Sequence, residues 1–134
     1  MMWVREHRAE IVITTLALAA GVGVYAYAHK DEGKLEQSKQ RGAEIVQALE
    51  RHRTEQGDYP STLEALVPRF VPSIEPPTWG LRRWRYRRYR AGDVASNAPA
   101  DSSARYFQLS VAANDRGYPV LYYDFAGRRW VLNN

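Results

Sequence analysis

The sequence predicts an α+β protein, in which one long N-terminal helix packs on a small antiparallel sheet of three or four strands. Two observations support this fold class. No proline occurs between Ile11 and Gln56, where an uncharged apolar run passes into a segment of helix-forming residues. From Leu81 onward the apolar period changes to two, which is typical of strands. We divide the chain into an N-terminal flank (1–10), a transmembrane helix (11–28), an amphipathic continuation (29–56) and a globular part that packs with it (57–134).

Length and composition limit the classes of protein that this chain represents. It has 134 residues, of which 45% are hydrophobic and 25% charged, and it has no cysteine. These values fit one folded domain with, at most, an anchoring segment. The absence of cysteine excludes a disulfide framework, a thiol nucleophile and a zinc site built on thiolates.

Residues 11–28 read IVITTLALAAGVGVYAYA and carry no charge. A helix of this length spans about 27 Å, close to the hydrocarbon core of a bilayer at about 30 Å. The alternative is a signal peptide cleaved after Ala28, because Ala26-Tyr27-Ala28 fits a small-x-small cleavage site. We favour the anchor, since the run exceeds the usual signal-peptide core of about 7–15 residues. Either interpretation carries the C-terminal part across the membrane. Four small residues at helical spacing predict a face for packing against another membrane helix: Ala17, Ala20, Gly21 and Val24.

The next elements follow from local patterns. Between Lys34 and Gln56 the apolar residues repeat at three and four positions, and Gly57 is expected to end the helix. Ser61 to Glu64 fits a capping box with Ser61 as N-cap. A short helix is expected to follow, with an apolar face made by Leu63, Leu66 and Val67. The prolines from Pro68 to Pro77 predict an ordered coil up to Gly80.

Four strand-like stretches complete the chain. In the first, Trp84 and Tyr86 share one face and Arg83, Arg85 and Arg87 share the other. Residues 91–104 predict a mobile loop, and 106–111 predict a strand. A turn is expected at 114–117, and 120–125 and 129–132 predict a hairpin closed around Ala126-Gly127.

The strongest local anomaly is LRRWRYRRYR at residues 81–90, with six arginines: Arg82, Arg83, Arg85, Arg87, Arg88 and Arg90. The segment carries +6 and the whole chain +4, so the remainder sums to −2 and the basicity is a patch. Guanidinium groups bind phosphates and carboxylates in bidentate fashion. An edge strand kept unpaired by its charge is one interpretation. An anionic lipid or an acidic protein partner is the second, and nucleic acid is the third and least favoured.

The order of parts resembles the type IV pilin and type II secretion pseudopilin family over residues 40–134. The resemblance is carried by Ala48-Leu49, by Gly57-Asp58-Tyr59-Pro60, by Leu63, Leu66, Val67 and Pro68, by Pro76-Pro77-x-Trp79-Gly80, by Phe107-x-Leu109-Ser110, and by Tyr123 and Trp130. The N-terminal residues differ from the family's leader, because no glycine precedes the apolar run and Glu10 lies before it. The resemblance implies a pilin-like fold and a non-enzymatic structural or assembly role in a type II secretion or type IV pilus-like system. It also implies a single-pass protein of the bacterial inner membrane, with its C-terminal domain in the periplasm and protein components of that machinery as partners.

No pattern in the sequence predicts catalysis or a cofactor. His7, His29 and His52 lack the i,i+3 or i,i+4 spacing of helical ligand pairs, and no nucleophile, zinc-protease or nucleotide-binding motif occurs. We therefore expect no enzyme activity, no cofactor and no small-molecule substrate. Some pseudopilins bind calcium in a sheet loop, and the resemblance points to Asn114, Asp115 and Asp124 as the residues at that place. A turn with solvated carboxylates is the favoured interpretation of these three.

Overall fold

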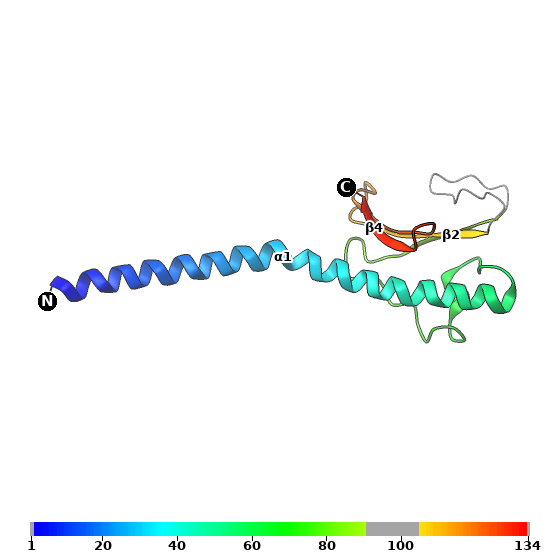
Figure 1. Ribbon diagram of the computed structural model, residues 1–134, viewed down its shortest axis with the longest axis horizontal. Helices are drawn as coiled ribbons and strands as arrows, with labels where there is room; N and C mark the ends of the chain where they lie inside the picture. The colour runs from blue at the N-terminus through cyan, green and yellow to red at the C-terminus, as the bar shows by residue number, and fades with distance from the viewer. Residues whose placement is uncertain (1, 91–104, 134) are drawn as a thin grey trace. The chain divides into compact units, whose positions relative to one another are not determined.

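A computed structural model describes the backbone of residues 2–90 and 105–133, and the side chains of 20–26, 29–90 and 105–133. The chain divides into two compact units, Met1–Gly33 and Lys34–Asn134. Its elements are the helix α1 (Met2–Gln56), a 3-10 helix (Leu63–Leu66) and four strands. The strands are β1 (Arg85–Tyr89), β2 (Tyr106–Ala112), β3 (Val120–Asp124) and β4 (Arg129–Asn133). The predicted α+β class, a long N-terminal helix followed by a small antiparallel sheet, is confirmed (Figure 1).

Helix α1 ends where the sequence predicts. Gly57 has φ +80° and donates its backbone N–H to the Arg53 carbonyl at 2.8 Å. Glycine adopts this left-handed conformation without a steric penalty, so it closes the last turn. The predicted apolar face is buried: Ile45 and Val46 are nearly inaccessible, and Ala48 and Leu49 are fully so.

The short helix after α1 differs from the prediction in two respects. It is a 3-10 helix of four residues, and its N-cap is Thr62, whose side chain makes no capping hydrogen bond. The predicted capping box at Ser61 is therefore wrong. In a 3-10 helix residues i and i+3 eclipse, so Leu63 and Leu66 share the buried face. Val67, which an α-helix would place beside them, is exposed because the chain is already extended there.

The coil from Val67 to Gly80 is held on α1 by hydrogen bonds, in agreement with the prediction of an ordered coil. The Arg51 guanidinium donates to the Phe70 carbonyl at 2.7 Å, and the Arg41 guanidinium donates to the Pro76 carbonyl at 2.6 Å. Ser38 is fully buried, and its hydroxyl oxygen accepts the backbone N–H groups of Thr78 and Trp79, each at 3.0 Å. These contacts tie successive points of the coil to successive turns of the helix.

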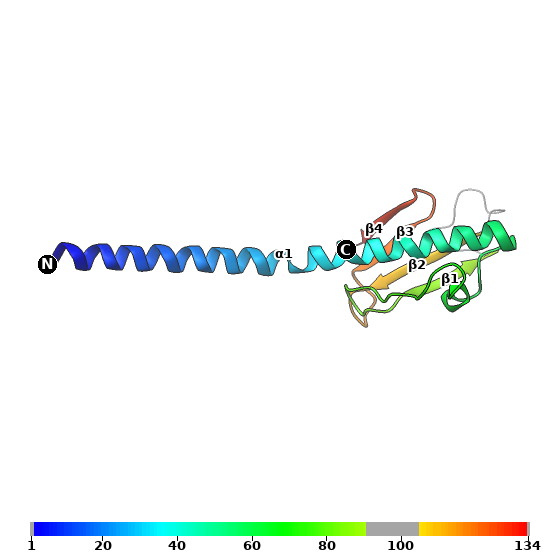
Figure 2. The ribbon, with the colours of Figure 1, turned by 90° about the horizontal axis from the view of Figure 1, so that it is seen from below.

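The sheet has the order β1-β2-β3-β4, with every neighbouring pair antiparallel (Figure 2). The turn at 114–117 forms as predicted, with the Gly117 N–H bonded to the Asn114 carbonyl at 3.0 Å. The β3–β4 hairpin also forms as predicted, with Asp124 opposite Arg129. The segment 91–104, predicted as a loop, lies outside the described residues.

The core lies between the C-terminal half of α1 and the sheet. Ile45 and Leu49 from the helix meet Phe107 and Leu109 from β2, and all four are buried. Phe107 is the centre of an aromatic cluster: its ring lies 5.0 Å from Tyr59, 5.4 Å from Phe125 and 5.8 Å from Tyr123, centroid to centroid. The residues that direct the sheet onto the helix are therefore the alternate side chains of β2, as the period of two predicted.

Candidate docking surface

Strand β1 is an edge of the sheet, since β2 is its only neighbour among the described strands. Its side chains alternate, as the sequence predicts for a strand. Arg85 and Arg87 are exposed on the face away from the helix, where they lie opposite Ser110 and Gln108. Tyr86 lies opposite the buried Leu109, on the face toward the helix. The Cα atoms of these two exposed arginines are therefore about 7 Å apart along one edge of the sheet.

Aromatic and polar neighbours hold the outer face of β1 in place. The Tyr89 ring stacks on Tyr106 with centroids 4.8 Å apart. The Arg87 guanidinium lies over the Tyr89 ring, 5.2 Å from its centroid. Such cation–π contacts at exposed sites are worth about 0.5–1 kcal/mol, so they orient the arginine without neutralising its charge.

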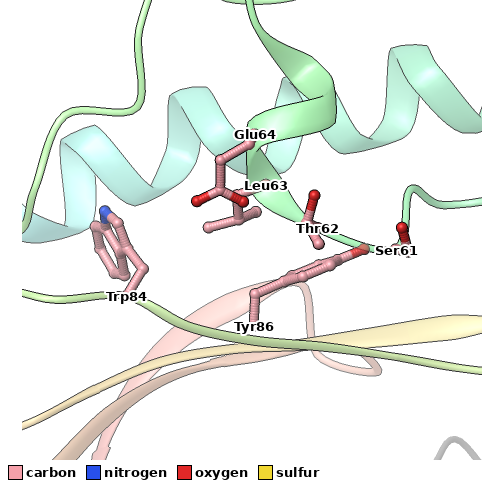
Figure 3. A pocket seen from close by; sticks show the side chains of 6 residues that line it. All are labelled: Ser61, Thr62, Leu63, Glu64, Trp84 and Tyr86. Atoms are coloured by element: carbon pink, nitrogen blue, oxygen red, sulfur yellow. The ribbon is translucent and has the colours of Figure 1, made fainter.

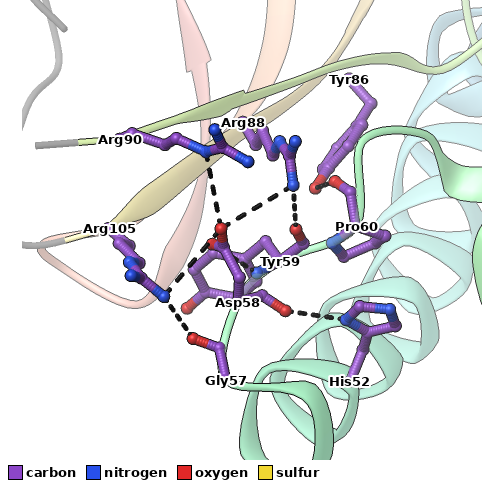
Figure 4. A network of polar contacts seen from close by, with 9 residues as sticks. All are labelled: His52, Gly57, Asp58, Tyr59, Pro60, Tyr86, Arg88, Arg90 and Arg105. Atoms are coloured by element: carbon purple, nitrogen blue, oxygen red, sulfur yellow. Dashed lines mark hydrogen bonds and ion pairs between the residues drawn. The ribbon is translucent and has the colours of Figure 1, made fainter.

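The six predicted arginines do not form one patch. Arg82, in the left-handed conformation at φ 55°, and Arg83 precede β1 and are exposed. Arg88 and Arg90 turn instead toward Asp58, at the end of the turn that follows α1 (Figure 4). The predicted contact surface therefore divides into an exposed group and a group engaged within the fold.

Asp58 is the centre of this second group. Its Oδ2 atom lies 3.8 Å from Arg88 Nη1, 3.6 Å from Arg90 Nε and 4.0 Å from Arg105 Nη1. The same arginines also bind main-chain carbonyls: Arg88 donates to Tyr59 at 2.9 Å and Arg105 donates to Gly57 at 2.5 Å. Sequence reasoning missed Arg105 and the role of Asp58, because they lie 47 residues apart and no local pattern links them.

A shallow pocket of about 210 Å³ opens beside β1, between the strand and the 3-10 helix (Figure 3). The residues that line it are Ser61, Thr62, Leu63, Glu64, Trp84 and Tyr86. The Trp84 indole N–H donates to the Glu75 carbonyl at 2.8 Å, and the Tyr86 hydroxyl donates to the Pro60 carbonyl at 2.7 Å. Both rings are thus fixed by their polar ends. Burial raises the pKa of Tyr86 well above its usual range, so this hydroxyl remains a donor.

Trp84 and Tyr86, which the sequence places on one face of a strand, line the same pocket, although β1 begins only at Arg85. Both are partly buried and pack against the core cluster. The sequence did not reveal the pocket, because its other wall comes from residues 61–64. Pockets that enclose a small-molecule ligand measure about 300–1,000 Å³, so this one suits a single side chain better than a cofactor.

The predicted membrane-helix face is described only in part. Ala20, Gly21 and Val24 are exposed, and the side chain of Ala17 lies outside the described residues. Most side chains of the predicted transmembrane segment 11–28 also lie outside the described residues, including that of Ala28 at the predicted cleavage point. Among the residues that were described, no helical stretch combines the length and apolar character needed to cross a membrane.

Two of the three residues considered for metal binding have structural partners. The Asn114 side chain forms two hydrogen bonds to nearby main-chain groups. Its Oδ1 accepts the Arg116 N–H at 3.0 Å, and its amide donates to the Tyr118 carbonyl at 2.6 Å. Asp124 pairs with Arg129 at 3.8 Å, and Asp115 is exposed. Within residues 20–26, 29–90 and 105–133, no group of three His, Asp or Glu side chains is placed to hold a metal ion.

The two histidines in the described region also bind main-chain carbonyls. His29 lies with Nδ1 2.9 Å from the Tyr25 carbonyl, and His52 lies with Nδ1 2.8 Å from the Asp58 carbonyl. In each case Nδ1 carries the proton, since a carbonyl only accepts. Their role is to hold local backbone, and His7 lies outside the described side chains.

Comparisons of the chain with protein-family models, with curated proteins and with solved structures found no significant match. The class that the fold defines is therefore a helix-plus-sheet protein with an arginine-bearing edge strand. On this strand Arg85 and Arg87 are exposed, and a shallow pocket lies beside it.

Proposed function

We propose that the chain is a non-enzymatic, membrane-anchored component of a type II secretion or type IV pilus-like system, with a pseudopilin-like fold. The observation that supports this proposal most directly is the packing of the C-terminal half of α1 against one face of a four-stranded antiparallel sheet. The N-terminal residues of the same helix, 11–28, supply an apolar segment of membrane-spanning length in the sequence.

In this role the two units have different tasks. The helix in Met1–Gly33 holds the protein in the bacterial inner membrane and associates with other membrane helices through Ala20, Gly21 and Val24. The unit Lys34–Asn134 lies in the periplasm and docks on partner proteins. Exposed arginines on β1 suit this docking, because arginine binds acidic surfaces through planar, bidentate contacts.

Site-specific cross-linking in native membranes tests the proposal. A photo-reactive residue replaces Val24 in the helix or Arg87 on β1, and a matched control carries it at Gln47, which is exposed on α1. We expect adducts with components of a secretion or pilus assembly from the first two positions. Recovery of the chain from the soluble fraction, or as a monomer without adducts from any position, would contradict the proposal.

A second function is favoured by one observation, the six arginines within residues 81–90. In this alternative the domain is a binding module, tethered or released after Ala28, that captures a polyanion. Its mechanism is charge neutralisation, so its affinity for DNA or anionic vesicles falls steeply with salt. Replacement of Arg83, Arg85 and Arg87 by serine must then weaken binding to these polyanions, and unaltered affinity would remove this alternative.

A further inference from the structure

The open edge of β1 has a definite set of main-chain groups. Along a strand, the N–H and C=O groups of successive residues point to opposite sides. Two hydrogen bonds show to which side each residue of β2 points. The Ala112 carbonyl accepts the Leu81 N–H at 2.9 Å, on the β1 side of β2, and the Ala113 N–H bonds to the Pro119 carbonyl at 2.8 Å, on the β3 side. The main-chain N–H and C=O groups of the even-numbered β2 residues therefore point toward β1. Because Arg85 pairs with Ser110, those of the odd-numbered β1 residues point toward β2.

The N–H and C=O groups of Tyr86 and Arg88 consequently point outward. Within residues 2–90 and 105–133, no main-chain hydrogen bond outside the helices and strands involves either residue. A strand that presents such groups is a template for pairing with another extended chain. In β1, two residues direct their N–H and C=O groups outward, and these groups can pair with an extended segment of about five residues.

The side chains beside this edge define the chemistry of that segment. Arg85 and Arg87 are exposed on the outer face, so cross-strand neighbours there are favoured when they are acidic. On the other face the pocket offers the rings of Trp84 and Tyr86 and the side chain of Leu63, which favour an apolar neighbour. Glu64 also lines the pocket and disfavours a second carboxylate there.

We infer that β1 binds an extended segment of a partner protein in which acidic and apolar residues alternate, and that this segment joins the sheet as an additional antiparallel strand. The acidic residues lie over Arg85 and Arg87, and an apolar residue enters the pocket between Trp84 and Tyr86. A second copy of this chain does not fit the same edge, because pairing β1 with β1 would oppose arginine to arginine.

This inference deepens the docking role proposed above, on which it rests only for its biological setting. The two fail separately. Cross-linking to a secretion assembly without peptide binding would leave the proposed function and remove the inference. Peptide binding by a chain that forms no adducts in native membranes would do the reverse.

The test uses the full chain in detergent micelles and a fluorescent peptide, Glu-Val-Glu-Leu-Glu-Val-Glu, with binding read as anisotropy. We expect saturable binding, and at least tenfold weaker binding by a peptide of the same composition in which all the glutamates are contiguous. Replacement of every glutamate by lysine should abolish binding. The double variant R85E/R87E should lose at least tenfold in affinity. The charge-matched control K30E/K39E, on exposed or half-exposed helix positions, should retain the affinity of the unmodified chain.

Two backbone-methylated peptides separate strand pairing from charge attraction. In antiparallel pairing the apolar residues share the face of Tyr86 and direct their N–H groups at β1, whereas the glutamates direct theirs away. Methylation of the Val and Leu amides should abolish binding, and methylation of the glutamate amides should preserve it. Equal binding of both methylated peptides and of the contiguous-glutamate peptide, or binding of DNA or anionic vesicles with no binding of the alternating peptide, would overturn the inference.

Discussion

Gly42 of α1 lies directly under the indole of Trp130 from β4. A Cβ atom on Gly42 would overlap two atoms of the Trp130 ring and press on Trp84, whose ring centroid is 5.9 Å from that of Trp130. The absent side chain therefore lets two tryptophans from the two edges of the sheet meet over one turn of the helix. This contact joins β4 and the residue before β1 to α1.

Replacement of Gly42 by alanine should destabilise the protein by about 1–3 kcal/mol, the usual cost of forcing extra atoms into a packed site. The gain in helix propensity, about 0.5–1 kcal/mol, is too small to offset it. Urea unfolding followed by fluorescence measures the free energy of unfolding. The matched control is Gly33→Ala, at a helical position with open space around it, which should leave stability unchanged or slightly raised. Equal effects of the two substitutions would show that Trp130 does not pack on Gly42.

Ser38→Ala tests the attachment of the coil to the helix. The Ser38 hydroxyl oxygen accepts two backbone N–H groups, from Thr78 and Trp79, and donates to the Lys34 carbonyl at 2.8 Å. Alanine leaves these donors without an acceptor at a buried position, so we expect a loss of about 2 kcal/mol in the free energy of unfolding. Ser73→Ala is the control, because the Ser73 hydroxyl is exposed and bonds only to the Glu75 carboxylate. A loss below about 0.5 kcal/mol at Ser38 would contradict the assigned role.

Asp58→Asn tests the three-arginine group. The substitution removes a charge that faces Arg88, Arg90 and Arg105, and it leaves the amide oxygen able to accept the Tyr59 N–H. We expect the free energy of unfolding to fall by about 1 kcal/mol, because each ion pair is long and partly exposed. The decrease should be smaller in high salt. Asp115→Asn, an exposed carboxylate in a turn, provides the control. A loss independent of salt would mean that packing, and not charge, makes Asp58 important.

The free energy of unfolding should decrease at alkaline pH. Burial, followed by the hydrogen bond to Glu50, raises the pKa of Tyr59, and burial raises the pKa of Tyr86 and Tyr123. A raised folded-state pKa means that the stabilisation is fully present below the unfolded value of about 10 and is lost as the pH rises above it. Unfolding free energies measured across that range should fall, and Tyr86→Phe should make the decline shallower. A decline of the same slope in this variant would exclude Tyr86 as a contributor.

Many local features of the fold were predictable from neighbouring residues. The helix ends at Gly57 because glycine tolerates positive φ, the side chains of β1 and β2 alternate because strands have a period of two, and the Asn114–Gly117 turn follows from its own residue types. The capping box failed as a prediction because Thr62 and the short 3-10 geometry prevailed over the sequence pattern at Ser61.

Residues close together in the chain were enough to predict where the helix and strands occur, and they show that the basic charge is concentrated at residues 81–90. The partners of that charge became known only from the folded arrangement. Asp58, distant in sequence, lies within ion-pair distance of Arg88, Arg90 and Arg105, whereas Arg85 and Arg87 are exposed on the outer face of β1. The pocket beside Trp84 and the contact of Gly42 with Trp130 likewise exist only once the coil and the sheet fold onto the helix. Such contacts depend on distances in space, which the order of residues does not specify.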